Sequence, residues 1–272
     1  MTGFARLLLH SLKRARTLLV AMAVLLAGFQ ALLISYANSI RISNTFDQMS
    51  ATVPPFLREL MGPSFATMMS FRGIVCVGYF HPVVMGSLIA LTIALATTPA
   101  AEIESGFMDL ILARPLARHW IVTRTIVLTA LCASLLLGAM MCGTWIGLKM
   151  LVPSDAGWPS SDLIRSLAIN LGLLMLCWSG IAMAIGCASK RRGVAGGLTG
   201  MLALTTFLLD YLGRVWKPLE QAARVSPFRY YAPFDLLLGR RLPTGDLLML
   251  ASFAAVGFAL AYVFFSRRDI SH

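Results

Sequence analysis

The chain has 272 residues, of which 58% are hydrophobic and only 13% are charged. A soluble domain carries about 25% charged residues, so this composition excludes a soluble enzyme of ordinary surface and indicates a membrane protein. The net charge of +11 does not indicate nucleic-acid binding, because the basic residues form short clusters at the ends of apolar runs and not one stripe.

Six apolar runs are each long enough to cross a hydrocarbon core, which needs about 20 helical residues. Each run must be helical, because an isolated strand would leave its backbone groups without partners in lipid. The sequence therefore predicts an all-α membrane protein, a single domain over residues 1–272 with six transmembrane helices. The predicted spans are approximately 17–37, 75–98, 121–148, 167–188, 194–212 and 247–265.

Basic residues precede the first run, as they do in a secretory signal peptide. We expect a retained helix, because the run is longer than a signal core and no small-residue cleavage site follows it. Apolar residues are interleaved with this basic start, which fits either an interfacial helix on the inner leaflet or a simple topology anchor. The basic residues are Arg6, Lys13, Arg14 and Arg16.

The second run contains Pro82, which we expect to kink the helix. After this run the chain reads AEIESGFMDLILARPLAR at 101–118, a charged stretch between two apolar spans. Because Pro115 disfavours helix at the preceding residue, a helix continuing from the second span over 100–113 would end near Arg114.

On that helix one face is apolar, with Phe107, Leu110 and Ile111 in a stripe, while Glu102 and Asp109 lie together on another side. A short helix with an apolar and an acidic face suits docking into a groove on a partner protein. A solvated loop that only reverses the chain is the alternative interpretation.

Small residues four apart allow helices to approach closely. Such pairs occur in the third and fifth runs, where they indicate either contact with a second subunit or packing within one chain. Near the end of the fifth run, Asp210 and Arg214 have the spacing of an ion pair on one helix. A place for Asp210 in a translocation path is the alternative. The small pairs are Gly143/Gly147, Gly193/Gly197 and Gly196/Gly200.

The basic N-terminus and the turn at 190–192 favour cytoplasmic N- and C-termini in a multi-pass protein of a bacterial-type inner membrane. The stretch at 101–118 then lies on the cytoplasmic side. Six basic residues between 213 and 246, in the last outer segment, count against this orientation.

No nucleotide or metal chemistry is expected of this chain itself. The sequence lacks the GxxxxGK[ST] pattern of a phosphate-binding loop, so the chain is not expected to be an ATPase. Its five cysteines form no CxxC pair and its four histidines no HExxH pattern. A soft-metal site at the outer face, around Cys76, His81 and nearby methionines, is the alternative.

The stretch at 101–118 resembles the cytoplasmic segment that follows the second membrane helix in ABC-2 type transporter permeases. Phe107 stands where that family usually has Thr, and Met108 where it commonly has Leu. The six-span plan and an outer hairpin-like segment, SPFRYYAPFDLLLG at 226–239, extend the resemblance along the chain. The matching residues are Glu102, Glu104, Gly106, Asp109, Leu110, Leu112, Arg114, Pro115 and Arg118.

The resemblance implies a type V exporter-like architecture in which this chain is the permease subunit of an ATP-driven exporter. It implies a translocation path formed as a homodimer or heterodimer, and a coupling segment at 100–118 that contacts a separate nucleotide-binding ATPase, which holds ATP and Mg. A membrane scaffold that recruits a cytoplasmic partner without transport is the alternative. The implied coupling residues are Glu102, Glu104, Gly106, Phe107, Asp109, Leu110, Ile111, Arg114, Pro115 and Arg118.

Overall fold

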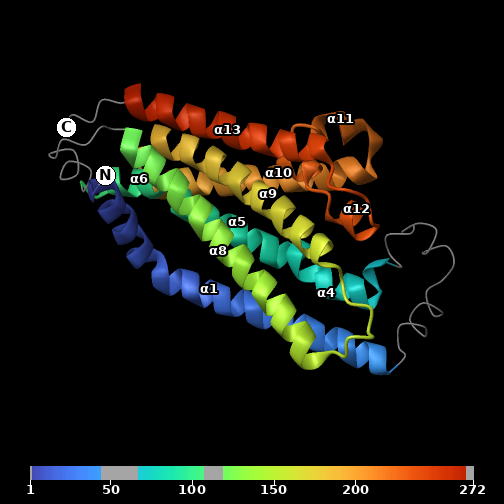
Figure 1. The fold of residues 1–272 in the computed structure, drawn as a ribbon. Helices are drawn as coiled ribbons and strands as arrows, with labels where there is room; N and C mark the ends of the chain where they lie inside the picture. Colours follow the sequence, from blue (N-terminus) through green and yellow to red (C-terminus); the bar gives the residue numbers. More distant parts are fainter. Residues whose placement is uncertain (1, 44–66, 107–118, 268–272) are drawn as a thin grey trace.

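The structure is a computed structural model and describes residues 2–43, 67–106 and 119–267, with side chains from Leu7 onward. Every regular element in these ranges is a helix, and six spans are long and apolar enough to cross a membrane (Figure 1). The predicted all-α, six-span fold is confirmed, and it fits a multi-pass membrane protein. The spans are α1 (Thr2–Ile42), α4 with α5 (Phe71–Phe80 and Pro82–Ala96), α8 (His119–Leu151), α9 (Ser161–Ala188), α10 (Arg192–Val215) and α13 (Thr244–Arg267).

The two ends of the bundle differ in construction (Figure 1). One end, here named the termini end, holds the start of α1, the end of α13 and the short helix α6 (Thr98–Glu104). The opposite end, here named the cap end, holds short helices between α10 and α13. They are η1 (Lys217–Leu219), α11 (Glu220–Ala223), η2 (Pro227–Tyr230) and α12 (Pro233–Leu237).

Helix α1 differs from the predicted first span, because it starts at Thr2 and includes the basic N-terminal stretch. The basic stretch, which fits either an interfacial helix or a topology anchor, is the first part of this one long helix. Figure 1 shows this part running in a different direction from the rest of α1. Basic residues do not interrupt helical hydrogen bonds, so the helix continues through them although the apolar run begins only near residue 17.

The second span is broken at His81, as Pro82 predicts. Helix α4 ends at Phe80 and α5 begins at Pro82, whose ring removes a backbone donor at this point. The Nδ1 atom of His81 accepts a hydrogen bond of 3.3 Å from the backbone N–H of Val83, so the histidine caps α5. The predicted kink is confirmed.

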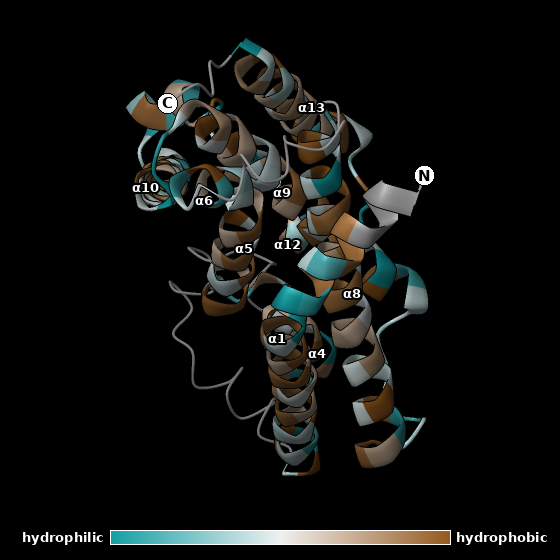
Figure 2. Cartoon of the chain, turned by 90° about the vertical axis from the view of Figure 1, so that its left-hand side faces the viewer, coloured by the Kyte–Doolittle hydropathy of each residue, from teal (hydrophilic) through white to brown (hydrophobic). Residues whose placement is uncertain are grey.

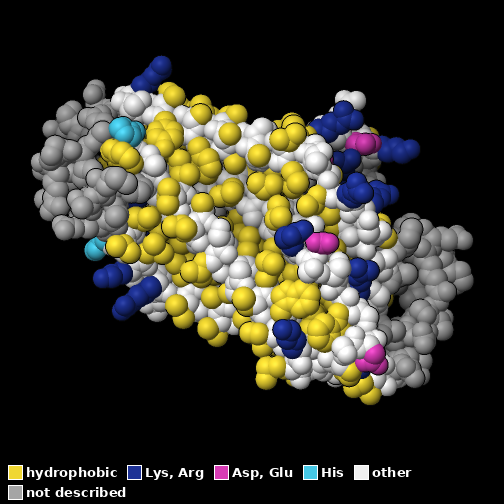
Figure 3. All heavy atoms as spheres, in the orientation of Figure 1, with side chains coloured by type: hydrophobic (Ala, Val, Ile, Leu, Met, Phe, Trp, Pro, Cys, Tyr) yellow, Lys and Arg dark blue, Asp and Glu magenta, His cyan; other side chains and the backbone are white. Residues whose placement is uncertain are grey.

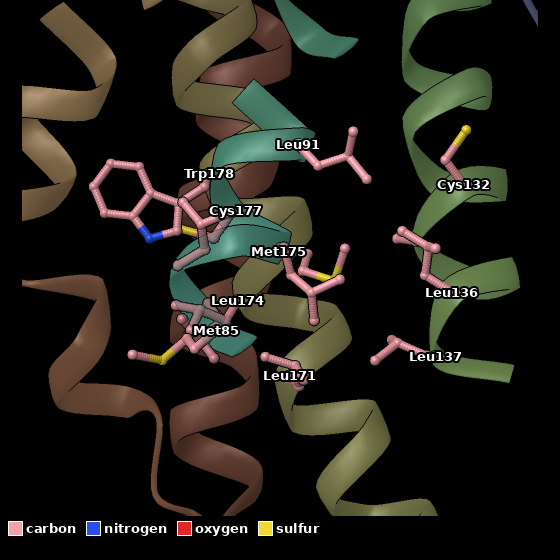
Figure 4. Close-up of a cluster of buried hydrophobic side chains, with 14 of the residues drawn as sticks. Met85, Leu91, Cys132, Leu136, Leu137, Leu171, Leu174, Met175, Cys177 and Trp178 are labelled. Carbon is pink, nitrogen blue, oxygen red and sulfur yellow. The ribbon is translucent and has the colours of Figure 1, made fainter. Parts of the chain in front are cut away.

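Helix α9 is the centre of the bundle, and it packs against α13, α5, α8 and α10. Its side chains interdigitate with those of α5 and α8 in a buried apolar cluster, in which Met85, Cys132, Leu171 and Trp178 take part (Figure 4). By contrast, α10 lies at the edge of the bundle (Figure 2), and few of its residues are buried. Much of the α10 surface is therefore left for lipid or for another protein.

Glycines set two of the closest helix contacts. A Cβ atom at Gly180 would lie 2.6 Å from the carbonyl oxygen of Ala254, and one at Gly257 would meet the backbone of Gly180, so α9 and α13 touch backbone to backbone. Likewise a Cβ at Gly143 would lie 2.7 Å from the Cα of Ala27 on α1. The Gly143/Gly147 pair thus packs within one chain, whereas a Cβ at Gly193, Gly196, Gly197 or Gly200 would meet no described atom within 4 Å.

A buried polar cluster joins three helices inside this apolar bundle. The amide of Gln30 on α1 donates to the hydroxyl of Thr144 on α8 at 2.8 Å, and the hydroxyls of Tyr79 on α4 and Thr144 lie 3.0 Å apart. All three side chains are buried. Because lipid offers no partners to polar groups, such bonds favour one arrangement of α1, α4 and α8.

The surface in Figure 3 has a broad hydrophobic belt along the bundle, with Lys and Arg side chains gathered towards both ends. This distribution is the one that a bilayer selects, because apolar side chains face the hydrocarbon and charged groups reach the headgroups.

We predict that Gly257→Ala lowers the stability of the bundle by about 1–3 kcal/mol, because its methyl group must push α9 and α13 apart. The control is Gly245→Ala on the same helix, where a Cβ meets no described atom within 4 Å. There the substitution should be neutral or stabilising by up to about 1 kcal/mol. Thermal unfolding of the two purified variants measures the difference, and equal midpoints would contradict the backbone contact.

Candidate functional site

The candidate coupling site begins at α6, which follows α5 after a break at Thr97. This helix ends at Glu104, and Gly106 then takes a left-handed conformation with φ of 69°. Glycine adopts that conformation without strain and commonly follows a helix end. The predicted helix over 100–113 is therefore wrong as one continuous element, because the chain turns at residues 105–106.

Glu102 lies inside the protein and not on an outer acidic face. Its carboxylate accepts from Nη2 of Arg124, the sixth residue of α8, with 2.7 Å to each oxygen. Glu102 and Arg124 are only 6% and 2% exposed. A buried charge needs a close partner of opposite sign, and each of these residues supplies that partner for the other. The pair fixes α6 to the start of α8.

Glu104 makes a second link from α6, this time to the start of α10. Its carboxylate accepts a 2.9 Å hydrogen bond from the backbone N–H of Arg192, the first residue of α10. Carboxylates favour helix N-termini, where backbone donors are unpaired and the helix dipole is positive. The Arg192 side chain in turn donates from Nη2 to the carbonyl of Ala94 on α5 at 3.0 Å.

These contacts make α6 a junction between three spans. It follows α5 directly after the break at Thr97. It also contacts α8 through Glu102 and α10 through Glu104. A displacement of the chain beyond Gly106 would therefore be transmitted to α5, α8 and α10 together.

Three of the predicted coupling residues are described, namely Glu102, Glu104 and Gly106. The first two are brought together with Arg124 and Arg192, and Gly106 forms the turn after them. The remaining predicted residues lie outside the described residues: Phe107, Asp109, Leu110, Ile111, Arg114, Pro115 and Arg118.

Arg124 and Arg192 are site residues that sequence reasoning missed. A signal was present for Arg124, because a charge within the long apolar helix α8 requires a partner inside the protein. No comparable signal identified Arg192, since its backbone N–H is the group that binds Glu104.

The cap end accounts for part of the basic excess between 213 and 246. Arg214 pairs with Asp210 at 2.9 Å, which confirms the predicted pair, and Arg240 pairs with Asp235 at 2.8 Å. Arg229 and Glu220 lie 3.7 Å apart. Basic residues here thus stabilise the local fold.

A buried tyrosine attaches the cap to the second span. The hydroxyl of Tyr231 donates to the backbone carbonyl of Tyr79 at 2.7 Å. Burial raises the pKa of Tyr231 above its ordinary value, so the hydroxyl remains a proton donor. This bond holds the cap against the C-terminal part of α4.

Within the described ranges, no group of three or more His, Cys, Asp or Glu side chains is placed to hold a metal ion. His81 caps α5 and its ring lies edge-on to Phe29, with 5.7 Å between ring centroids. Cys76 is a buried free thiol. Both residues thus have structural contacts of their own.

In comparisons with known proteins, no family model and no curated protein matches this chain.

We predict that Glu102→Ala destabilises the protein by about 3–5 kcal/mol, because it leaves the Arg124 guanidinium buried without its counter-charge. Asp162→Ala is the control, since it removes the acid of the exposed Asp162–Arg165 pair, and it should cost at most about 1 kcal/mol. Thermal unfolding in detergent measures both.

A second variant tests whether the loss of stability comes from the unpaired charge or from the lost side-chain volume. Replacing Glu102 and Arg124 together by leucine should recover much of the stability lost in Glu102→Ala, because no unpaired charge remains. A double variant at least as unstable as the single one would show that the ion pair is not what the site depends on.

Proposed function

We propose that this chain is the permease subunit of an ABC-2 type ATP-driven exporter. It forms the translocation path as a dimer and is coupled to a separate nucleotide-binding ATPase through the segment that begins at α6. ATP and Mg are held by that partner, and this chain binds no cofactor and performs no hydrolysis.

The observation that carries the proposal is the attachment of α6. The coupling segment follows the second span, which is where the resemblance to ABC-2 permeases expects it. Its first residues are fastened to α8 by Glu102–Arg124 and to α10 by Glu104–Arg192. A push from an ATPase on the segment would reach three spans at once and rock them as a group.

The exposed face of α10 supports the dimer. Gly193, Gly196, Gly197 and Gly200 leave the start of this helix without side chains that would hold another helix away. Small residues at such a face allow close approach in a bilayer, where van der Waals packing drives association. The second copy is either the same chain or a sister permease.

The contacts of Glu102 and Glu104 change which residues we expect to contact the ATPase. Glu102 is used inside the chain, so it positions the segment and does not contact the ATPase. Glu104 is exposed on its outer side while one oxygen binds the α10 N-terminus. We therefore assign partner contact to Glu104 and to the predicted residues after Gly106.

The test is copurification of an ATPase with the tagged chain from solubilised native membranes. The variant Glu104→Gln/Asp109→Asn should recover about fivefold less ATPase than the wild type, through loss of charged contacts at a docking surface. The control Asp155→Asn/Asp162→Asn removes the same charge at exposed positions of the opposite end and should recover as much as the wild type. Mass spectrometry and an ATP hydrolysis assay identify the partner.

The outcomes separate the two functions. If well-folded wild-type protein brings down no ATPase but another cytoplasmic protein, the chain is a scaffold that recruits a partner without transport. If the ATPase is recovered equally with all variants, the exporter proposal stands and the docking acids are wrongly assigned.

We also predict the orientation, with the termini end in the cytoplasm of a bacterial-type inner membrane. A fluorescent protein fused after residue 272 should be bright, and alkaline phosphatase at the same position should be inactive, because it folds only outside the cytoplasm. Fusions within 239–243, at the cap end, should behave in the opposite way. Active phosphatase at the C-terminus would reverse the orientation and remove the coupling segment from any cytoplasmic ATPase.

A further inference from the structure

A cavity of about 490 Å³ opens at the termini end, and Glu102, Arg124 and Arg192 of the coupling site take part in its lining. Its walls come from α1, α5, α6, α8 and the start of α10. The volume falls within the range of small-molecule sites, about 300–1,000 Å³. None of the functions argued above uses this space.

One continuous face of α1 forms a wall of the cavity. The lining residues of this helix recur at intervals of three and four, so they lie on the same side. Polar His10, Ser11 and Arg14 lie between apolar residues at the two ends of this face, and Leu18 at its far end is 50% exposed. The cavity therefore continues onto a surface that faces lipid in a membrane-spanning chain. The residues are Leu7, His10, Ser11, Arg14, Ala15 and Leu18.

The cavity carries a net positive charge. Three arginines line it, Arg14, Arg124 and Arg192, against one acid, Glu102. Both oxygens of Glu102 are bound to Arg124, so this carboxylate does not compensate the other two arginines. Among the described residues no acid lies within ion-pair distance of Arg14 or of the Arg192 guanidinium.

A buried donor in the cavity wall is also unmet. The Nε atom of Arg124 is buried and has no hydrogen-bond partner among the described residues. Leaving a buried donor of a charged group unpaired is unfavourable, and sites with such donors attract an oxygen acceptor or ordered water. The two uncompensated arginines therefore favour an anion in the cavity, and the buried guanidinium of Arg124 adds positive charge behind them.

The apolar part of the cavity restricts the kind of anion. Leu95 and Leu128 line it together with Leu7 and Leu18, so a free hydrated ion would have to lie against hydrocarbon side chains. An amphiphile meets both demands, because its phosphate lies among the arginines while its acyl chain follows α1 past Leu18. Arg14 lies just before the apolar run that starts near residue 17, which is the headgroup level.

We propose that this cavity binds the phosphate headgroup of an anionic membrane phospholipid, with Arg14 and Arg192 as its direct partners and Arg124 as the positive charge behind them. Lipid binding at this site does not require an ATPase, so it can be tested independently of the proposed function.

The test is lipid binding to the full chain in a neutral detergent, followed by native mass spectrometry. Short-chain phosphatidylglycerol should bind the wild type about tenfold more tightly than phosphatidylcholine of the same chain length, because only the former has net negative charge. Measurements at about 0.15 M salt suppress attraction between charges that are not in contact.

A pair of matched variants locates the site. Arg14→Gln/Arg192→Gln should lose about tenfold in phosphatidylglycerol affinity, and Arg16→Gln/Arg191→Gln should retain it within about twofold. The four arginines are exposed, and the control removes the same charge from neighbouring positions that do not line the cavity. Equal losses in both variants would overturn the proposal in favour of a diffuse electrostatic attraction.

Two further comparisons use only the wild type and hold even if a variant fails to fold. A large molar excess of inorganic phosphate should leave bound phosphatidylglycerol in place, because phosphate lacks the acyl chain. Displacement by phosphate alone would assign the cavity to a free anion and overturn the lipid proposal. Equal binding of phosphatidylcholine and phosphatidylglycerol would also overturn it.

Discussion

The structure depends on the exclusion of water from the hydrocarbon core, because any polar group that enters it must find its partner inside the protein. Helices satisfy the backbone, and several buried side chains follow the same rule. Gln30, Thr144 and Tyr79 bond to one another across three helices, while Glu102 and Arg124 neutralise each other near the termini end. Polar contacts thus determine which helices are neighbours.

Apolar packing alone would not select one arrangement, since lipid tails are as apolar as leucine. The bundle obtains its specificity where backbones touch. At Gly180 and Gly257 the absence of side chains lets α9 and α13 meet directly, and at Gly143 the same holds for α8 and α1. Helix α9 is consequently held on several sides, whereas the glycine face of α10 lines an open groove beside α5.

Much of the fold could be predicted from hydropathy, because the length of an apolar run and the thickness of a bilayer are directly related. All six spans, the break at Pro82 and the Asp210–Arg214 pair are local features, and each is confirmed. Helix α1 begins before the predicted span at 17–37, because hydropathy marks where a helix enters lipid and not where its hydrogen bonds begin.

The candidate site was less accessible to sequence reasoning, because its contacts join segments that are distant in the chain. Glu102 meets Arg124 across 22 positions, and Glu104 meets Arg192 across 88. Helical periodicity placed Glu102 on an outer acidic face, since that reasoning extended one helix through Gly106. Ser105-Gly106 is recognisable in the sequence as a helix end, because glycine commonly follows the last turn of a helix. The sequence does not show that Arg124 and Arg192 are the partners of the two acids.

Arg192 connects the two sites at the termini end, and this connection has a mechanical consequence. Its backbone N–H binds Glu104 of α6, while its side chain lines the positive cavity and donates to Ala94. An anionic headgroup that binds the side chain would restrain the start of α10, which is also the anchor of the coupling segment. If movement of α6 pulls the start of α10 with it through the Glu104 contact, the distance between Arg192 and Arg14 on α1 changes. By linkage, a lipid that prefers one of these distances must favour one position of the coupling segment, and the segment must alter lipid affinity by the same factor.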